Sequence, residues 1–343
     1  MIVVNVPIEE LESRYSAQWA NWFHVELCKK GYTTIPIHPS TLRSEIKDGA
    51  FLDVVGTHYA KASQIQRICQ LIDDGTIPRN ERVVFLFQDG WFPVEQLAYI
   101  RDGLKCHDWR FVGLFHDGNW DVWDFVTRSN MYVWGEELEN AWFKIYDRVV
   151  VASEYHERVL LETRIIPNHK IEVIPWKVEV PKELLEYPSK KENIVVFPHR
   201  LTEDKQPELF RKLIHDEKIL PKDWIAVRTR DEKLDKRSYY QLLAKSKVVV
   251  STALLEMFGI SMIEAVMLGC YPIVPDRLAY REIFRDPFRY RGYSDLCDKL
   301  RDVVTRDSGF KHIAEHTPFK SQFHQKLIDD SFFEDLFDIL ETV

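Results

Sequence analysis

The most informative part of this sequence runs from Lys247 to Phe284 and reads KVVVSTALLEMFGISMIEAVMLGCYPIVPDRLAYREIF. The valines Val248–Val250 form the short continuous apolar run that is typical of a strand covered on both faces. A helix is expected to begin near Ile260 or Ser261, just after a glycine, and a second buried strand is expected at Tyr271–Val274. This order of strand, helix and strand predicts a βαβ unit in a parallel sheet, and therefore an α/β fold.

The turn between this strand and this helix has the properties of a phosphate-binding site. Ligands of open α/β sheets bind at the carboxyl ends of the strands. The first turn of a helix offers unpaired N–H groups and the positive end of the helix dipole. A glycine at this point lets the backbone approach a ligand closely. The residues that would form the turn are Phe258, Gly259, Ile260 and Ser261.

Two carboxylates, Glu256 and Glu264, flank this turn. A carboxylate beside a phosphate is unfavourable unless it accepts hydrogen bonds from nearby hydroxyls. A sugar on one side and a ribose on the other would supply them, so the pattern favours a nucleotide-sugar. Taken singly, each acid also fits a simpler role, Glu264 as an acid in the first turns of a helix and Glu256 as a solvated loop charge. The apolar residues around them equally fit a core.

Two cations follow the first strand expected in the second half of the chain, Ile194–Phe197. Arg200 and Lys205 lie in the loop after that strand and would project toward the same edge as Glu256. Two positive charges near a helix N-terminus would neutralise a diphosphate leaving group. Either residue alone is more commonly a solvated surface charge.

The rest of the chain alternates apolar runs with helical patterns, which predicts two successive doubly wound α/β halves. In the first half we expect strands at residues 2–6, 33–37, 52–55, 83–87, 111–115 and 148–152. The polar, proline-bearing segment after residue 175 is interpreted as a linker. The predicted organisation is an N-terminal acceptor-binding domain (1–175), a linker (176–192), a C-terminal donor-binding domain (193–320) and a final helix (321–343) that crosses back to the first domain.

Composition excludes several classes of protein. The net charge is −8 over 343 residues, which argues against binding nucleic acid through bulk electrostatics. No apolar run is long enough for a membrane span, and the N-terminus has no signal-peptide pattern, so a cytoplasmic location is expected (host cytoplasm if the protein is viral). The five cysteines form no CxxC pair, which argues against a structural zinc site. Neither GxGxxG nor GxxxxGK[ST] occurs after a strand, which disfavours dehydrogenases and P-loop proteins.

Taken together, these segments resemble the large family of retaining GT-B glycosyltransferases with an E-x7-E motif. Glu256-Met-Phe-Gly-Ile-Ser-Met-Ile-Glu264 matches that motif, and Arg200 with Lys205 matches the family's donor-diphosphate pair. The longer pattern, PHR…DK-x-PE followed by residues 248–284, resembles the C-terminal half of the tRNA-queuosine mannosyltransferase group over roughly residues 193–290. The resemblance implies two Rossmann-like domains that face a central cleft.

The resemblance also implies roles for the residues of the second domain. Arg200 and Lys205 would bind the diphosphate of a UDP- or GDP-sugar. Glu256 would contact hydroxyls of the transferred sugar, and Glu264 would hold the ribose. The backbone of residues 258–261 would lie against sugar and phosphate. No metal is required in this family, and no DxD motif follows a strand here in the manner of metal-dependent glycosyltransferases.

In the first domain, such enzymes often place a histidine after a strand, near the anomeric carbon. His116 follows the expected strand 111–115 and fits that position, although a histidine there is as often structural. Asp117, Asp89 and Arg14 are candidates for acceptor contacts. The glycine-rich loop that many members have after the first strand is absent. Either Arg14, Ser16 and Gln18 replace it or the donor phosphates rest wholly on the second domain.

Two interpretations of the acceptor compete. The first is a hydroxyl on a modified base in nucleic acid, with hydroxymethylpyrimidine in viral DNA as the preferred case and a tRNA base as the other. It rests on the queuosine resemblance and on a soft likeness of LESRYSAQWANWF to glycosyltransferases of bacterial viruses. Two basic segments support it: Arg281–Arg291, which alternates arginines with aromatic residues, and residues 228–237.

The second acceptor class is a cell-surface glycan, a lipid-linked sugar or a small metabolite. It is the commonest use of this fold and agrees with the acidic net charge. A third interpretation is an inactive module that only binds a nucleotide-sugar. The oligomeric state is not indicated by the sequence.

Overall fold

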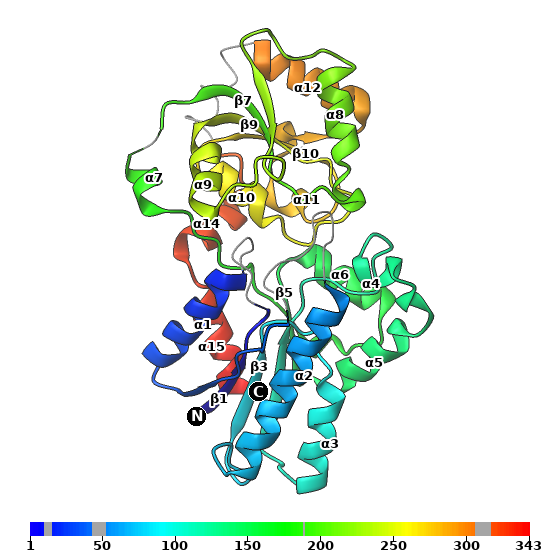
Figure 1. Cartoon of the computed structure of the whole chain (residues 1–343), viewed down its shortest axis with the longest axis vertical. Helices are drawn as coiled ribbons and strands as arrows, with labels where there is room; N and C mark the ends of the chain where they lie inside the picture. Colours follow the sequence, from blue (N-terminus) through cyan, green and yellow to red (C-terminus); the bar gives the residue numbers. More distant parts are fainter. Residues whose placement is uncertain (10–15, 43–52, 188, 306–316) are drawn as a thin grey trace. The chain divides into compact units, whose positions relative to one another are not determined.

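The computed structural model describes residues 1–9, 16–42, 53–187, 189–305 and 317–343. The chain forms two compact units. Unit 1 comprises Met1–Ile174 and Phe332–Val343, and unit 2 comprises Pro175–Ser331 (Figure 1). Each unit is a parallel sheet with helices on both faces, so the predicted fold class of two α/β domains is confirmed.

Unit 1 contains a six-stranded parallel sheet in the order β2-β1-β3-β4-β5-β6. The strands are β1 (Ile2–Val6), β2 (Thr33–Pro36), β3 (Val83–Phe87), β4 (Trp109–Leu114), β5 (Arg148–Val151) and β6 (Ile171–Val173). The principal helices are α1 (Ser16–Lys29), α2 (Val54–Asp73), α3 (Val94–Leu104), α5 (Gly135–Ile145), α6 (Glu154–Thr163) and α15 (Phe332–Thr342). Helices α1 and α15 lie together on one side of the sheet, and α2 and α3 lie on the other (Figure 1).

The strand expected at residues 52–55 is wrong in the part that the structure describes. Val54 and Val55 begin helix α2 and are 43% and 59% exposed. Asp53 holds the N-cap position with an extended backbone, and aspartate is a favoured residue there. Two adjacent exposed valines are compatible with the first turn of a helix, whereas in a central strand both side chains would be buried. The sixth strand of the sheet is β6, which the sequence analysis did not predict.

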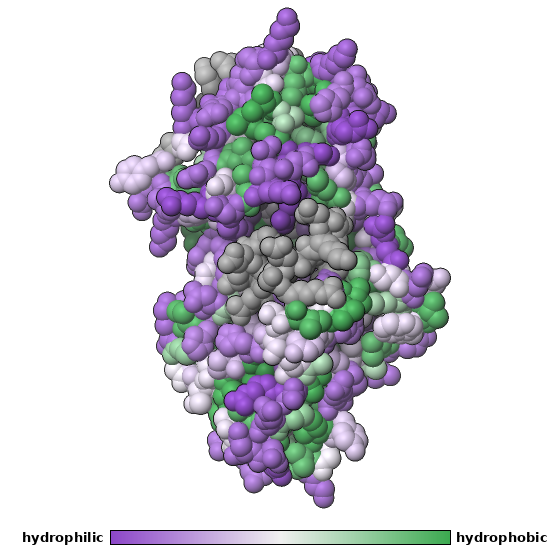
Figure 2. All heavy atoms as spheres, viewed as in Figure 1, coloured by the Kyte–Doolittle hydropathy of each residue, from purple (hydrophilic) through white to green (hydrophobic). Residues whose placement is uncertain are grey.

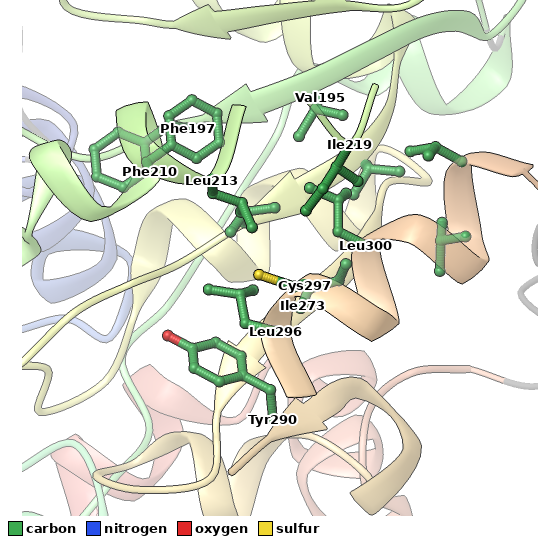
Figure 3. Close-up of a cluster of buried hydrophobic side chains, with 14 of the residues drawn as sticks. Val195, Phe197, Phe210, Leu213, Ile219, Ile273, Tyr290, Leu296, Cys297 and Leu300 are labelled. Atoms are coloured by element: carbon green, nitrogen blue, oxygen red, sulfur yellow. The ribbon is translucent and has the colours of Figure 1, made fainter. Parts of the chain in front are cut away.

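Unit 2 contains a five-stranded parallel sheet in the order β11-β10-β9-β7-β8. The strands are β7 (Glu192–Phe197), β8 (Ile225–Arg228), β9 (Ser246–Val250), β10 (Tyr271–Pro275) and β11 (Arg289–Tyr290). The principal helices are α8 (Pro207–His215), α9 (Lys236–Lys245), α10 (Ile260–Met267), α12 (Tyr293–Thr305) and α14 (Ser321–Asp329). Figure 3 shows the core between the sheet, α8 and α12, where Phe197 packs against Phe210 and Leu213 lies near Leu296 and Leu300.

The C-terminal segment differs from the single helix expected at 321–343. The structure has two helices, α14 in unit 2 and α15 in unit 1. They are separated at Asp330, whose φ of 48° is left-handed and cannot continue a right-handed helix. The segment interpreted as a linker belongs to unit 2, where Trp176, Val178 and Val180 are buried.

Candidate functional site

The predicted cation and carboxylate of unit 2 meet at one edge of its sheet. Strands β7 and β9 pair in parallel, so the loops that follow them leave the same edge. Lys205 comes from the loop after β7 and Glu256 from the loop after β9. The Nζ atom of Lys205 lies 3.2 Å from Oε2 of Glu256 and also donates to the carbonyl oxygen of Leu255. The structure therefore brings together two residues that are 51 positions apart in the chain.

Arg200 joins this pair through Asp204, a residue that the sequence analysis did not single out. A guanidinium nitrogen of Arg200 lies 2.6 Å from Oδ2 of Asp204, and Nζ of Lys205 lies 3.6 Å from the same oxygen. Burial alone would raise the pKa of Asp204, but the charges of Arg200 and Lys205 outweigh it and hold that pKa below its usual value. Two cations and two carboxylates thus form one balanced cluster, in which Asp204 fixes the positions of both cations.

Helix α10 begins directly beside this cluster. Gly259 occupies its N-cap with a φ of +91°, a backbone conformation that favours glycine. A Cβ atom at this position would lie 2.8 Å from Cε1 of Tyr280. The side chain of Phe258 is buried and packs edge-on against Phe323. What this turn offers a ligand is therefore the first N–H groups of α10, which have no partner within the helix, and the hydroxyl of Ser261.

Glu264 is buried on the other side of α10, against helix α9. Its Oε1 lies 3.1 Å from Nζ of Lys236 and 2.8 Å from the hydroxyl of Tyr240, and its Oε2 accepts from the hydroxyl of Tyr239 at 2.9 Å. Burial and the charge of Glu264 raise the pKa of Tyr239 well above its ordinary value, so Tyr239 stays a donor. In the described part of unit 2 no hydrogen bond joins Glu264 to Lys205 or Glu256. Among the described residues, Oε2 of Glu264 accepts one hydrogen bond, from Tyr239.

A buried histidine was missed by the sequence analysis. Nε2 of His199 lies 2.8 Å from Oγ of Ser251, and its Nδ1 lies 3.4 Å from Oγ of Ser261. The Ser251 hydroxyl also contacts the hydroxyl of Tyr280 at 2.9 Å, and Tyr280 donates to Glu256 at 3.5 Å. Burial first, then the charges of Lys205 and Arg200, lower the pKa of His199 well below its usual value. His199 is therefore neutral at physiological pH.

The candidates in unit 1 lie at the carboxyl ends of β3 and β4. His116 follows β4, and its Nε2 lies 2.8 Å from the carbonyl oxygen of Gln88, which follows β3. Its ring is tilted against that of Trp19 with centroids 5.2 Å apart, and burial lowers the pKa of His116. Asp89 forms an ion pair with Lys61 at 2.8 Å. These contacts place His116 and Asp89 at the same sheet edge.

The other two acceptor candidates are Asp117 and Arg14. Asp117, which follows His116, accepts a hydrogen bond from the backbone N–H of Gly118 at 2.9 Å. Arg14 lies outside the described residues.

The segment Arg281–Arg291 does not form the predicted stacking surface. Phe284, Phe288 and Tyr290 are all buried. Three of its arginines form ion pairs within the protein, since Arg281, Arg289 and Arg291 all contact Asp276. Its aromatic residues are core residues, so the alternation of arginine and aromatic side chains here reflects packing.

Two further properties of the described residues concern metal ions and membranes. No group of three or more histidine, cysteine, aspartate or glutamate side chains there could hold a metal ion. None of the helices described is long and apolar enough to span a bilayer. On the face shown in Figure 2, hydrophilic side chains alternate with smaller hydrophobic patches.

Comparison with solved structures supports the architecture. Sucrose-phosphate synthase from Thermosynechococcus elongatus aligns over 99% of this chain and 100% of its own, with a TM-score of 0.64 and 11% identity. TarM from S. aureus, solved with UDP, fondaparinux and alpha-GlcNAc-glycerol, aligns over 80% of this chain with a TM-score of 0.55 and 16% identity. This chain spans 58% of the length of TarM. At these identities the likeness shows the fold: the chain has the two-domain GT-B glycosyltransferase fold.

Comparison with curated sequences gives a more particular relative. The tRNA-queuosine alpha-mannosyltransferase of Drosophila melanogaster is 24% identical over 275 residues, which cover 65% of this chain and 72% of that protein. No family model matches the chain.

Proposed function

We propose that this protein is a retaining glycosyltransferase that transfers a sugar from a UDP- or GDP-sugar to a hydroxyl group. The observation that carries the proposal is the contact between Lys205 and Glu256 beside the N-terminus of α10. This contact joins a lysine and a glutamate at the carboxyl edge of a parallel sheet, beside the first N–H groups of α10, and ligands of such sheets bind at that edge. The GT-B fold supports the proposal, and TarM with its bound UDP is an example of that fold holding the nucleotide.

The chemistry breaks the bond between the anomeric carbon and the diphosphate oxygen, which keeps the electron pair, and forms a bond to the acceptor oxygen on the same face of the sugar. The proton of the acceptor hydroxyl passes to the leaving diphosphate. Negative charge grows on the leaving diphosphate, and Arg200, Lys205 and the amides of α10 would stabilise it. Because Asp204 and Glu256 balance the charges of Arg200 and Lys205, the net charge of this cluster contributes little to stabilising the leaving diphosphate. Its advantage is preorganisation, since Asp204 holds Arg200 and Lys205 in place before the donor arrives. No protein-bound metal is needed for this step.

The remaining candidate residues take roles in the same scheme. Glu256 accepts hydroxyls of the transferred sugar, and Oε2 of Glu264 accepts one ribose hydroxyl. For His116 of unit 1, the family resemblance implies a role at the anomeric carbon, which the residue would fill as a neutral imidazole. Asp89 and Asp117 contact the acceptor.

For the acceptor, we propose a hydroxyl on a modified base in nucleic acid. The support is the curated relative, whose name states a tRNA acceptor. This relative favours a tRNA base over hydroxymethylpyrimidine in viral DNA. The viral DNA acceptor is supported by the resemblance of the N-terminal segment to glycosyltransferases of bacterial viruses. A second candidate, a glycan or small-molecule acceptor, is favoured by the burial of Phe284, Phe288 and Tyr290, because these residues leave no stacking surface at Arg281–Arg291.

The test combines a donor panel with three acceptor classes. Purified protein is incubated with radiolabelled UDP- and GDP-sugars and, separately, with bulk tRNA, hydroxymethylated DNA, and a glycan and lipid extract. We expect label in tRNA. Label only in DNA or only in the extract would identify one of the other acceptors. Absence of transfer and of donor hydrolysis with every sugar would contradict the glycosyltransferase proposal and favour a binding module.

A matched pair of variants separates the site from general damage. Glu256→Gln removes the carboxylate at the sugar position and is expected to lower the turnover rate about 100- to 1000-fold. Glu208→Gln makes the same change on α8, where Glu208 forms an exposed pair with Arg211, and should leave the rate unchanged. Equal activity of the two variants would remove Glu256 from the site.

A further inference from the structure

A continuous hydrogen-bonded chain of side chains runs through unit 2 beneath the candidate donor site. It begins at Oγ of Ser261 and passes to Nδ1 of His199 at 3.4 Å, from Nε2 of His199 to Oγ of Ser251 at 2.8 Å, and from there to the Tyr280 hydroxyl at 2.9 Å. It ends at Oε2 of Glu256, 3.5 Å from that hydroxyl. The three inner residues are almost fully buried. The two ends are residues assigned above to the phosphate and the sugar of the donor.

The protons in this chain have two self-consistent arrangements. A neutral imidazole has one N–H donor and one acceptor nitrogen, and each hydroxyl donates one hydrogen bond. In the first arrangement Nε2–H donates to Ser251, Ser251 donates to Tyr280, and Tyr280 donates to Glu256. Nδ1 then accepts the proton of the Ser261 hydroxyl. The chain is satisfied from within, and both of its ends are occupied.

The second arrangement reverses every bond. Tyr280 donates to Ser251, Ser251 donates to Nε2, and Nδ1–H donates to Ser261. The Ser261 proton is then available for a phosphate oxygen, and Oε2 of Glu256 is released from Tyr280 to accept a sugar hydroxyl. The weak bond from the N–H of Ala253 to Oγ of Ser251, at 3.4 Å, is compatible with both arrangements.

We infer that His199 is a positioning residue whose two tautomers couple the phosphate end of the donor site, Ser261, to its sugar end, Glu256. The inference rests on the proposed function, because the coupling matters only if a nucleotide-sugar binds there. Donor binding selects the Nδ1–H tautomer, and the same reversal prepares both ends of the site. His199 can do this because each of its two ring nitrogens contacts a different serine, whereas a glutamine side chain at this position would reach only one of them.

The direct test is the tautomer of His199, observed by nitrogen NMR of protein labelled with ¹⁵N-histidine. The His199 signals are those lost in His199→Gln. UDP and GDP are titrated, and calorimetry on the same samples reports whether either binds. We expect the proton to move from Nε2 to Nδ1 as the nucleotide saturates the site. Binding with no change of tautomer overturns the inference and leaves the proposed function standing. Failure of both nucleotides to bind contradicts the proposed function, and the inference falls with it.

A double-mutant cycle tests the coupling independently of NMR. In the described structure no hydrogen bond joins Ser261 directly to Tyr280, and the hydrogen-bonded path between them within the protein runs through His199 and Ser251. We expect the effects of Ser261→Ala and Tyr280→Phe on kcat/KM for donor hydrolysis to depart from additivity by at least about threefold. In the His199→Gln background, where the link to Ser261 is lost, the departure should fall below about twofold. Additive effects in the native background, which a purely space-filling role for His199 predicts, would overturn the inference. Coupling that persists with glutamine would also overturn it.

Discussion

At the scale of single residues, Gly259 combines a backbone demand with a steric one. Its φ of +91° is left-handed, and a Cβ atom would meet the ring of Tyr280 at 2.8 Å. Gly259→Ala should therefore cost about 2 kcal/mol or more in the free energy of unfolding, because backbone strain and the displaced Tyr280 ring add together. It should also weaken UDP or GDP binding, since the ring contacts Glu256. Chemical denaturation and calorimetry measure the two effects.

Gly31 provides the matched control for that substitution. Its φ of +86° is nearly the same, but a Cβ atom there would meet nothing within 4 Å. Gly31→Ala should cost only the backbone strain, about 1 kcal/mol, and should leave nucleotide binding unchanged. Equal losses of stability in the two variants would show that the Tyr280 contact has no energetic weight.

His156 makes a residue-scale prediction about pH. It is fully buried on α6 in unit 1, and both of its ring nitrogens lack a hydrogen-bond partner in the described structure. Burial, with a smaller effect from His116, lowers the pKa of His156 to about 3. Below about pH 6.5 the His156 ring binds a proton in the unfolded chain but stays neutral in the folded chain, and this difference lowers the free energy of unfolding. The full free energy of unfolding is therefore present above pH 6.5. The part due to His156 is lost as the pH falls toward 3.

The expected loss at pH 5 is about 2 kcal/mol in the free energy of unfolding. His156→Phe keeps a ring against Trp120 but cannot take up a proton, so its stability should fall about 2 kcal/mol less than that of the native protein between pH 7.5 and pH 5. His24→Gln, at an exposed position on α1, should behave like the native protein. Urea unfolding at the two pH values measures the difference. Parallel losses in His156→Phe and the native protein would contradict the assignment.

At the residue scale, one contact of the candidate site could be predicted from the order of strands and loops. Lys205 and Glu256 follow strands β7 and β9, and parallel strands bring their carboxyl ends to one edge, so their contact could be expected. Asp204 and His199 could not be recognised in the same way. The contact of His199 with Ser251 joins residues after β7 and β9, whose register shifts between Glu192 and Val195 in a way that sequence alone does not fix. Asp204 pairs with Arg200 and Lys205 inside one loop, whose conformation is likewise not fixed by sequence.

At the scale of elements, the central strands were predictable and the short or exposed elements were not. Strands β1, β3, β7 and β9 each contain a run of buried apolar residues, and this burial leaves a strong sequence signal. The start of α2 has two exposed valines after Asp53, and these form an apolar run that resembles a strand in the sequence. Asp53, at the N-cap position, is the residue type that indicates a helix start. Strand β11 has two residues, too few to create a pattern.

The packing of α15 on unit 1 gives an element-scale prediction. Phe333 is buried, with ring centroids 5.2 Å from Phe23 and 5.0 Å from Phe332. Phe333→Ala should destabilise unit 1 by about 3–5 kcal/mol, because it removes a large side chain from a packed aromatic cluster. Glu334→Ala changes the next residue, which is exposed, and should lie within about 0.5 kcal/mol of the native protein. Thermal denaturation compares them, and a mild effect of Phe333→Ala would mean that α15 is loosely held.

At the scale of the whole molecule, the two units differ in how the chain builds them. Unit 2 is one continuous segment, whereas unit 1 needs the final helix to return after unit 2 is complete. Arg82 fixes that return by donating to the carbonyl oxygens of Leu340, Glu341 and Val343. The core shown in Figure 3 lies entirely within unit 2. The two units should therefore respond differently when they are separated.

Residues 175–331 alone should fold and bind UDP or GDP, but should not transfer sugar, because His116 and Asp89 belong to unit 1. A cooperative thermal transition and calorimetry with the nucleotides test this expectation. Lys205→Met in the same fragment should reduce the affinity, since it removes one of the two cations from the cluster.

Residues 1–174 alone should not fold cooperatively, because loss of α15 uncovers Trp19 and Phe23. A folded 175–331 fragment without affinity for a nucleotide that the full chain binds would mean that unit 1 supplies essential donor contacts, and the donor site proposed within unit 2 would have to be extended.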